Sequence, residues 1–165
     1  FTTSAIFKCN LHENKANLFE SANSILSRVG CKNIPVLMSL VFSKCMSMLT
    51  YGVPAIMLKK YEFSKLDNCL VLFLAKIFGT FNKNILQQCL YYTGYLPVSL
   101  IVALNKMKFM SSFAQLENYN DTLFYFLKLV ALEELLVLSE AYNINENVSH
   151  RCRKEKMWSY FEGTL

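Results

Sequence analysis

Apolar residues recur along this chain at steps of three, four and seven, with polar residues between them, and this spacing predicts amphipathic helices rather than strands. The clearest case follows Asn10, where Glu13 three residues later completes a capping-box pattern and Gly30 ends the segment. Its core-facing positions are Leu11, Leu18, Ala22, Ile25 and Val29. We therefore predict a helix over residues 10–30.

The most apolar stretch, residues 34–52, predicts a central helix. Asn33 can cap its start, Pro35 suits the first turn because it has no N–H to leave unpaired, and Gly52 suits a left-handed end. The stretch is apolar on more than one side, so we expect it to pack against several neighbours. It should be the most buried helix, with Leu40 and Leu49 in the core.

Start and stop signals predict three further helices. One opens at Ser64 and closes at Gly79, and a shorter one is capped by Asn82. A fifth helix begins at Pro97, and we expect Lys106 and Lys108 on its outward side.

The distribution of polar and apolar residues changes near residue 117. A polar break is followed by a long apolar segment, 123–142, and by a charged segment after Ser149. We predict an all-α helical bundle of about five helices over residues 10–117, with one or two further helices over 118–165. Residues 1–9 alternate weakly and are interpreted as the end of a strand that belongs to an upstream segment.

The hydrophobic content of 53% raises the question of a membrane span. The longest apolar runs, however, carry Lys44, Lys76 or the Glu133-Glu134 pair near their middles, and a charge at mid-bilayer is costly. We therefore expect no membrane partner. Because the first residue is Phe1 rather than Met, we interpret the sequence as a piece of a longer chain.

Candidate catalytic and metal-binding residues are scarce. The six cysteines include no CxxC pair, so zinc is not expected, and the reduced thiols favour an intracellular location. His12 and His150 lie 138 residues apart in polar surroundings, where solvated side chains are the simplest interpretation. Without a nucleophile, phosphate loop or paired carboxylates in a catalytic setting, we expect neither enzymatic activity from this chain alone nor a small-molecule substrate.

The net charge of +5 is unevenly distributed. Residues 1–80 contain nine Lys or Arg against four Asp or Glu, whereas residues 81–165 contain eight of each. The whole excess therefore lies in the first half, which is where an anionic partner would bind.

Four segments carry a family resemblance: FKCNLHENK (7–15), NSILSRVG (23–30), SKCMSMLTYG (43–52) and FNKNILQQCLYYTGYLP (81–97). In this order they resemble the region after the palm in reverse transcriptases of non-LTR (LINE-type) retrotransposons. The resemblance covers about residues 5 to 115. It implies a helical thumb that grips a template-primer duplex, with the upstream fingers and palm of the same polyprotein as a further partner.

In that family the paired aspartates that hold two metal ions lie upstream of the matched region. Asp67 and Asp121 are not in such a setting, so the resemblance implies no catalytic residue and no cofactor here; magnesium would belong to the palm. The alternative is a helical protein-interaction or structural module, which includes a decayed retroelement fragment, without a nucleic-acid role.

The predicted nucleic-acid-binding residues are Lys8, Lys15, Arg28 and Lys32, which flank or line the outward side of the first helix. Lys15 and Arg28 are 13 residues apart, about 20 Å along a helix, a length that could follow phosphates over most of a duplex turn. We expect weak binding that does not depend on sequence.

Overall fold

The computed structural model describes residues 11–30, 32–56, 60–116, 122–145 and 148–165, and every regular element in these ranges is a helix. The predicted all-α fold is confirmed. Residues 1–9, the expected strand, and the cap at Asn10 lie outside the described residues. The chain forms two compact units, Phe1–Ser99 and Leu100–Leu165. The boundary between these units lies near the start of α6, whereas the sequence-based division was placed after residue 117.

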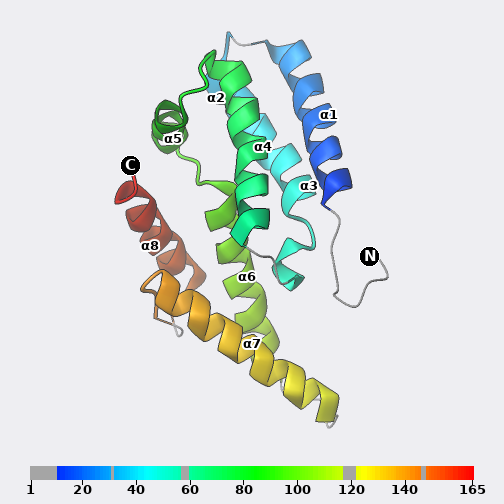
Figure 1. The fold of residues 1–165 in the computed structure, drawn as a ribbon, viewed down its shortest axis with the longest axis vertical. Coiled ribbons are helices and arrows are strands. Elements are labelled where there is room, and N and C mark those ends of the chain that lie inside the picture. Colours follow the sequence, from blue (N-terminus) through cyan, green and yellow to red (C-terminus); the bar gives the residue numbers. More distant parts are fainter. Residues whose placement is uncertain (1–10, 31, 57–59, 117–121, 146–147) are drawn as a thin grey trace. The chain divides into compact units, whose positions relative to one another are not determined.

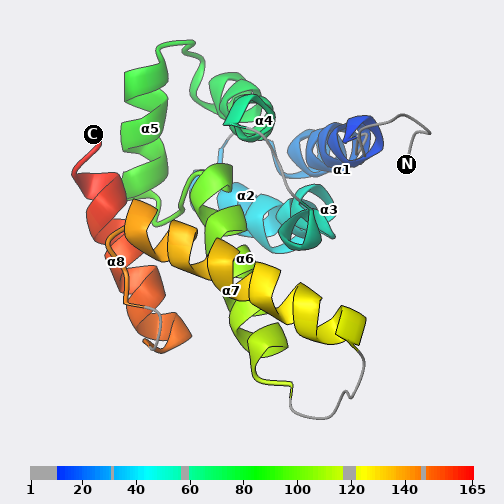
Figure 2. The ribbon, with the colours of Figure 1, turned by 60° about the horizontal axis from the view of Figure 1, so that its bottom comes forward.

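The first unit begins with α1, His12–Val29, which ends at Gly30 in a backbone conformation with positive φ. Of its five predicted core-facing positions, Leu18 and Ala22 are buried, whereas Leu11, Ile25 and Val29 are half-buried. α1 lies beside α3 and α4 (Figures 1 and 2). The amide of Asn14 donates to the carbonyl oxygen of Met48 at 3.1 Å, so α1 is also tied to α3 by a polar contact.

The predicted central helix is present but not regular. It consists of α2, Ile34–Leu40, a π-helical turn, Val41–Cys45, and α3, Met46–Thr50. The end signals act as predicted: the side chain of Asn33 accepts from the N–H of Val36, and Gly52 is left-handed with φ 72°. Within the turn the N–H of Met46 donates to the carbonyl of Val41, five residues back.

The π-helical turn has a clear packing reason. Leu37, Val41, Cys45 and Leu49 are each at most 1% exposed, and they are spaced four residues apart throughout. In a regular α-helix each step of four rotates the side chain by about 40°, so the last of these would turn away from the core. The wider π turn absorbs this drift and keeps all four on one face.

Two expectations for this stretch were wrong. Leu40 is half-buried rather than in the core, because the four-residue spacing places Leu37 and Val41 inward instead. Val36 and Met48 are exposed, so one side of the helix faces solvent. The stretch Ile34–Ala55 is the one helical segment among the described residues that alone is long and apolar enough to cross a membrane. The absence of a membrane partner stays a prediction.

α4, Lys60–Phe78, begins four residues before the predicted Ser64 and ends at Gly79 as expected. α5, Lys83–Tyr92, is capped by Asn82, whose side chain accepts from the N–H of Asn84 at 3.1 Å. The two helix axes differ in direction by 84°. After α5 the ring of Tyr95 stacks on Phe42 of the π turn, with 3.9 Å between ring centroids. This contact packs the segment that follows α5 against the π turn.

The second unit contains most of α6, Val98–Ala114, with α7, Thr122–Ala141, and α8, His150–Glu162. α7 crosses α6 in both views (Figures 1 and 2). Lys106, expected on the outward side, is only 8% exposed. Its ammonium lies 3.0 Å from the carboxylate of Glu134 on α7, because a buried cation requires a charged partner. Lys108 is exposed as predicted.

Candidate nucleic-acid interface

Of the four predicted binding residues, Lys8 lies outside the described residues, and the other three do not form one surface. Arg28 and Lys32 are exposed, as expected. Lys15 is half-buried, contrary to the expectation that its whole side chain points to solvent.

Lys15 and Arg28 lie on opposite edges of α1. Their separation of 13 residues corresponds to a difference of about 140° around a helix, so they cannot follow one row of phosphates. Glu13 and Glu20 are exposed on the face between them. The outward side of α1 is therefore not a continuous basic stripe, because acidic side chains lie between Lys15 and Arg28. The nucleic-acid-binding role of the four residues stays a prediction.

Lys15 instead belongs to the side of α1 that meets α4. Burial raises the pKa of the Cys69 thiol on α4, and the positive charge of Lys15 opposes that rise. The ammonium of Lys76, also on α4, donates to the side-chain oxygen of Asn23 on α1 at 2.7 Å. This electrostatic effect and this hydrogen bond place one cation from each helix along the same edge, which we call the α1–α4 edge.

The exposed face of α4 adds a third cation to the α1–α4 edge. Lys65 and Lys76 are eleven positions apart, which is about three turns, so both project from the same side of α4. The ammonium of Lys65 lies 5.0 Å from the ring centroid of Tyr61. That tyrosine is itself 54% exposed. The edge therefore combines Lys15, Lys65 and Lys76 with an aromatic ring.

The described residues of this edge gather positive charge, and the buried thiols of the same unit are not activated as nucleophiles. Burial raises the pKa of both Cys45 and Cys69, which keeps these thiols protonated and poorly nucleophilic. Across the residues that the structure describes, no group of three or more His, Cys, Asp or Glu could hold a metal ion. The expectation that this chain alone has no catalytic activity stays a prediction.

Sequence reasoning missed Lys65 and Lys76 because it concentrated on the first helix. Their eleven-residue spacing is a signal that could have found them, since positions i and i+11 share a helix face. The pairing of Lys76 with Asn23, 53 residues earlier, had no signal in the sequence. It depends on how α1 and α4 pack together.

No family model, no curated protein and no solved structure matches this chain. The resemblance to retrotransposon reverse transcriptases therefore stays a prediction that rests on the four sequence segments.

Proposed function

We propose that the first unit binds double-stranded nucleic acid through the α1–α4 edge, without reading its sequence. The observation that supports this most directly is that Lys65 and Lys76 project from one face of α4, with Lys15 of α1 along the same edge. The resemblance to a polymerase thumb, which holds a template-primer duplex, points to the same class of ligand.

The dimensions of the edge suit a phosphate backbone. Eleven residues of α4 separate Lys65 from Lys76, a distance of about 16 Å along the helix axis. This is close to half the length of a duplex turn, which is about 34 Å. Lysine contacts to phosphates supply affinity and carry no sequence information, so binding of this kind is non-specific.

Tyr61 adds a surface on which a base at an unpaired end of a strand can stack. Stacking on an aromatic ring tolerates any base, because every base has a π face. The lysine that lies over this ring, Lys65, strengthens the combination by a cation–π contact. A duplex with a single-stranded overhang should therefore bind more tightly than a blunt duplex of equal length.

The test is a salt titration of binding, measured by fluorescence anisotropy with an RNA–DNA duplex of about two helical turns. The parent chain should bind weakly, and the log–log salt slope should be about −0.9 per phosphate neutralised. The double variant Lys65→Glu/Lys76→Glu should lose binding and flatten that slope.

The matched control is Arg28→Glu/Lys32→Glu, which changes the net charge by the same amount at other positions. It should retain most of the binding. Equal losses in the two double variants would show that only the net charge matters. A parent chain that binds no duplex even at low salt would rule out the proposed function.

A second candidate function, a helical interaction module, is favoured by one face of α7. Tyr125, Leu129, Leu132 and Leu136 recur at steps of four, three and four, and all four are exposed. This is the spacing with which two helices pack knobs into holes. We call these four residues the α7 seam.

The charges beside the α7 seam fit a second copy of the same helix in parallel orientation. Lys128 and Glu133 flank the seam on opposite sides, five positions apart. In a parallel pair of helices, flanking residues at this separation face each other across the interface. Each Lys128 would then pair with Glu133 of the other copy.

Sedimentation equilibrium over a range of concentrations tests this candidate. A seam-directed dimer should be lost in Leu129→Glu and kept in Val137→Glu, since Val137 is exposed but lies off the seam. Lys128→Glu should weaken the dimer, and Lys128→Glu/Glu133→Lys should restore it. A chain that stays monomeric at every concentration would exclude the seam as a self-association site.

A further inference from the structure

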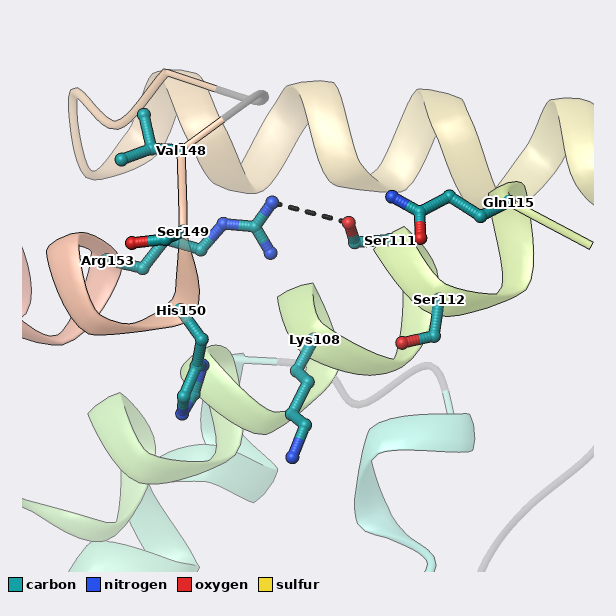
Figure 3. Close-up of a pocket in the computed structure, with 8 residues that line it drawn as sticks. All are labelled: Lys108, Ser111, Ser112, Gln115, Val148, Ser149, His150 and Arg153. Carbon is teal, nitrogen blue, oxygen red and sulfur yellow. Dashed lines mark hydrogen bonds between the residues drawn. The ribbon is translucent and has the colours of Figure 1, made fainter.

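The second unit contains an open pocket between α6 and the beginning of α8, with a volume of about 450 Å³ (Figure 3). Pockets of this size accommodate small molecules. The residues that give it its chemical character are polar or basic: Lys108, Ser111 and Ser112 from α6, and Ser149, His150 and Arg153 at the start of α8. None of the described residues that line it is acidic.

The innermost cation of the pocket is held in place. Arg153 is only 4% exposed, and its guanidinium donates to the carbonyl oxygen of Met107 at 3.2 Å and to the hydroxyl of Ser111 at 3.4 Å (Figure 3). A buried arginine keeps its charge at any physiological pH. The pocket therefore has a permanent positive charge in its wall that cannot swing away into solvent.

The rim of the pocket adds to this positive potential. Lys108 of α6 and His150 of α8 both line it, and in Figure 3 their side chains extend in the same direction, away from the Arg153 guanidinium. The pKa of His150 is lowered by burial and by the positive charges of Lys108, Arg153 and Lys154. Nearby positive charges therefore favour the neutral imidazole, and an anion in the pocket would weaken this effect.

Hydrogen-bond donors for an oxyanion are present at the same place. The hydroxyl of Ser149 accepts from the N–H of Cys152 and caps α8, a helix of 13 residues. The first backbone hydrogen bond of α8 runs from the N–H of Arg153 to the carbonyl oxygen of Ser149 at 3.0 Å, so the N–H groups of His150 and Arg151 precede the helical ladder. The helix dipole favours a negative charge there. The hydroxyls of Ser111 and Ser112 stand on the α6 side of the pocket.

We propose that this pocket binds the phosphate group of a phosphate ester. Two cations, a histidine, serine hydroxyls and the start of a helix line one cavity, and this combination suits a dianionic group with several acceptor oxygens. The inference does not rest on the nucleic-acid role of the α1–α4 edge, since no residue is shared between them.

The phosphate can belong to a free small molecule or to the end of a nucleic-acid strand. Both sources present the same monoester dianion to Lys108 and Arg153. If the pocket recognises only the phosphate ester, an attached nucleic-acid strand should add nothing to the affinity. A strand end would bind better with a 5′-phosphate than with a 5′-hydroxyl, because the other phosphates of the strand are common to both.

The experiment uses the full chain and follows the side-chain resonances of His150 by NMR while inorganic phosphate, then adenosine monophosphate, is added at constant ionic strength. Phosphate should shift these resonances and raise the pKa of His150. Lys108→Gln should weaken binding by about tenfold, the effect of one charge-assisted hydrogen bond. Lys156→Gln is the control, because Lys156 is exposed on α8, does not line the pocket and is not among the charges that lower the pKa of His150.

The arms of the experiment distinguish the outcomes. Stronger binding of a 5′-phosphorylated oligonucleotide than of its 5′-hydroxyl form supports a strand end. Equal affinities for the two oligonucleotides, together with tight binding of adenosine monophosphate, support a free ester. No shift of the His150 resonances with any phosphate compound would overturn the proposal, and so would equal losses of affinity in Lys108→Gln and Lys156→Gln. Neither result would bear on the proposal that Lys65 and Lys76 bind a duplex, because the two sites share no residue.

Discussion

The carboxylate of Asp67 in α4 accepts a hydrogen bond at 2.9 Å from the N–H of Ser99, at the start of α6. The residue before α6 is Pro97, whose side chain has no oxygen to cap the helix. Asp67 therefore supplies, from 32 residues earlier in the chain, the acceptor that an N-cap side chain normally provides. Burial raises the pKa of this carboxyl, and the hydrogen bonds from Ser99 and the charge of Lys83 oppose the rise.

Two substitutions of Asp67 distinguish the effect of its hydrogen bond on stability from the effect of its charge. Asp67→Ala should lower the free energy of unfolding by about 1 kcal/mol, the usual effect of a lost cap. Asp67→Asn keeps an acceptor oxygen and should be at least as stable as the parent at neutral pH. A raised carboxyl pKa means that ionisation disfavours the fold, so stability falls as pH rises from the ordinary carboxyl value through the raised one.

Urea denaturation at neutral and acidic pH measures both effects. The advantage of Asp67→Asn over the parent should shrink as the pH falls and the parent carboxyl becomes protonated. An advantage that does not change with pH would show that the Asp67 charge has no part in stability.

Deletion of Ser43 tests the reason given for the π-helical turn. Ser43 is exposed within the turn. Without it the buried positions would recur at steps of four, three and four, which a regular α-helix can bury on one face. We expect the free energy of unfolding to stay within about 1 kcal/mol of the parent.

The control for this deletion is removal of Ser24, an exposed residue in the regular helix α1. That deletion rotates everything that follows in α1 by about 100° and should be far more destabilising. Comparable losses for the two deletions, in thermal or urea unfolding, would contradict the packing reason for the π turn.

Truncation at two leucines of the central helix should have unequal effects. Leu49 is fully buried, and Leu49→Ala should lower the free energy of unfolding by about 2–5 kcal/mol. Leu40 is half-buried, so Leu40→Ala should cost clearly less. Equal shifts of the denaturation midpoint would mean that the π turn does not set which residues face the core.

The ion pair between Lys106 and Glu134 gives an asymmetric prediction. Lys106→Met leaves a largely buried carboxylate without its cation and should cost about 3 kcal/mol. Lys106→Met/Glu134→Leu removes both charges and should recover most of that loss. A double variant as unstable as the single one, in urea unfolding, would show that the pair itself stabilises the unit.

Local signals in the sequence were enough to place the helices, because caps and stops act within a few residues. Asn33, Asn82, Gly52 and Gly79 each mark the helix end that was predicted from them. The apolar spacing of α1 likewise identified Leu18 and Ala22 as its core residues. Helix spacing alone also separates Lys15 from Arg28, so that correction needed no structure.

Contacts between residues distant in the chain were decided only by the tertiary structure. Lys106 was expected on the outward side of its helix, but α7 places Glu134 beside it, and no local signal in the sequence indicated that Asp67 would accept from Ser99. The α1–α4 edge and the pocket at α8 arise in the same way, from side chains of separate helices. Local sequence fixes each helix face, but which faces meet depends on the burial of the whole unit, and this decides which charges lie together.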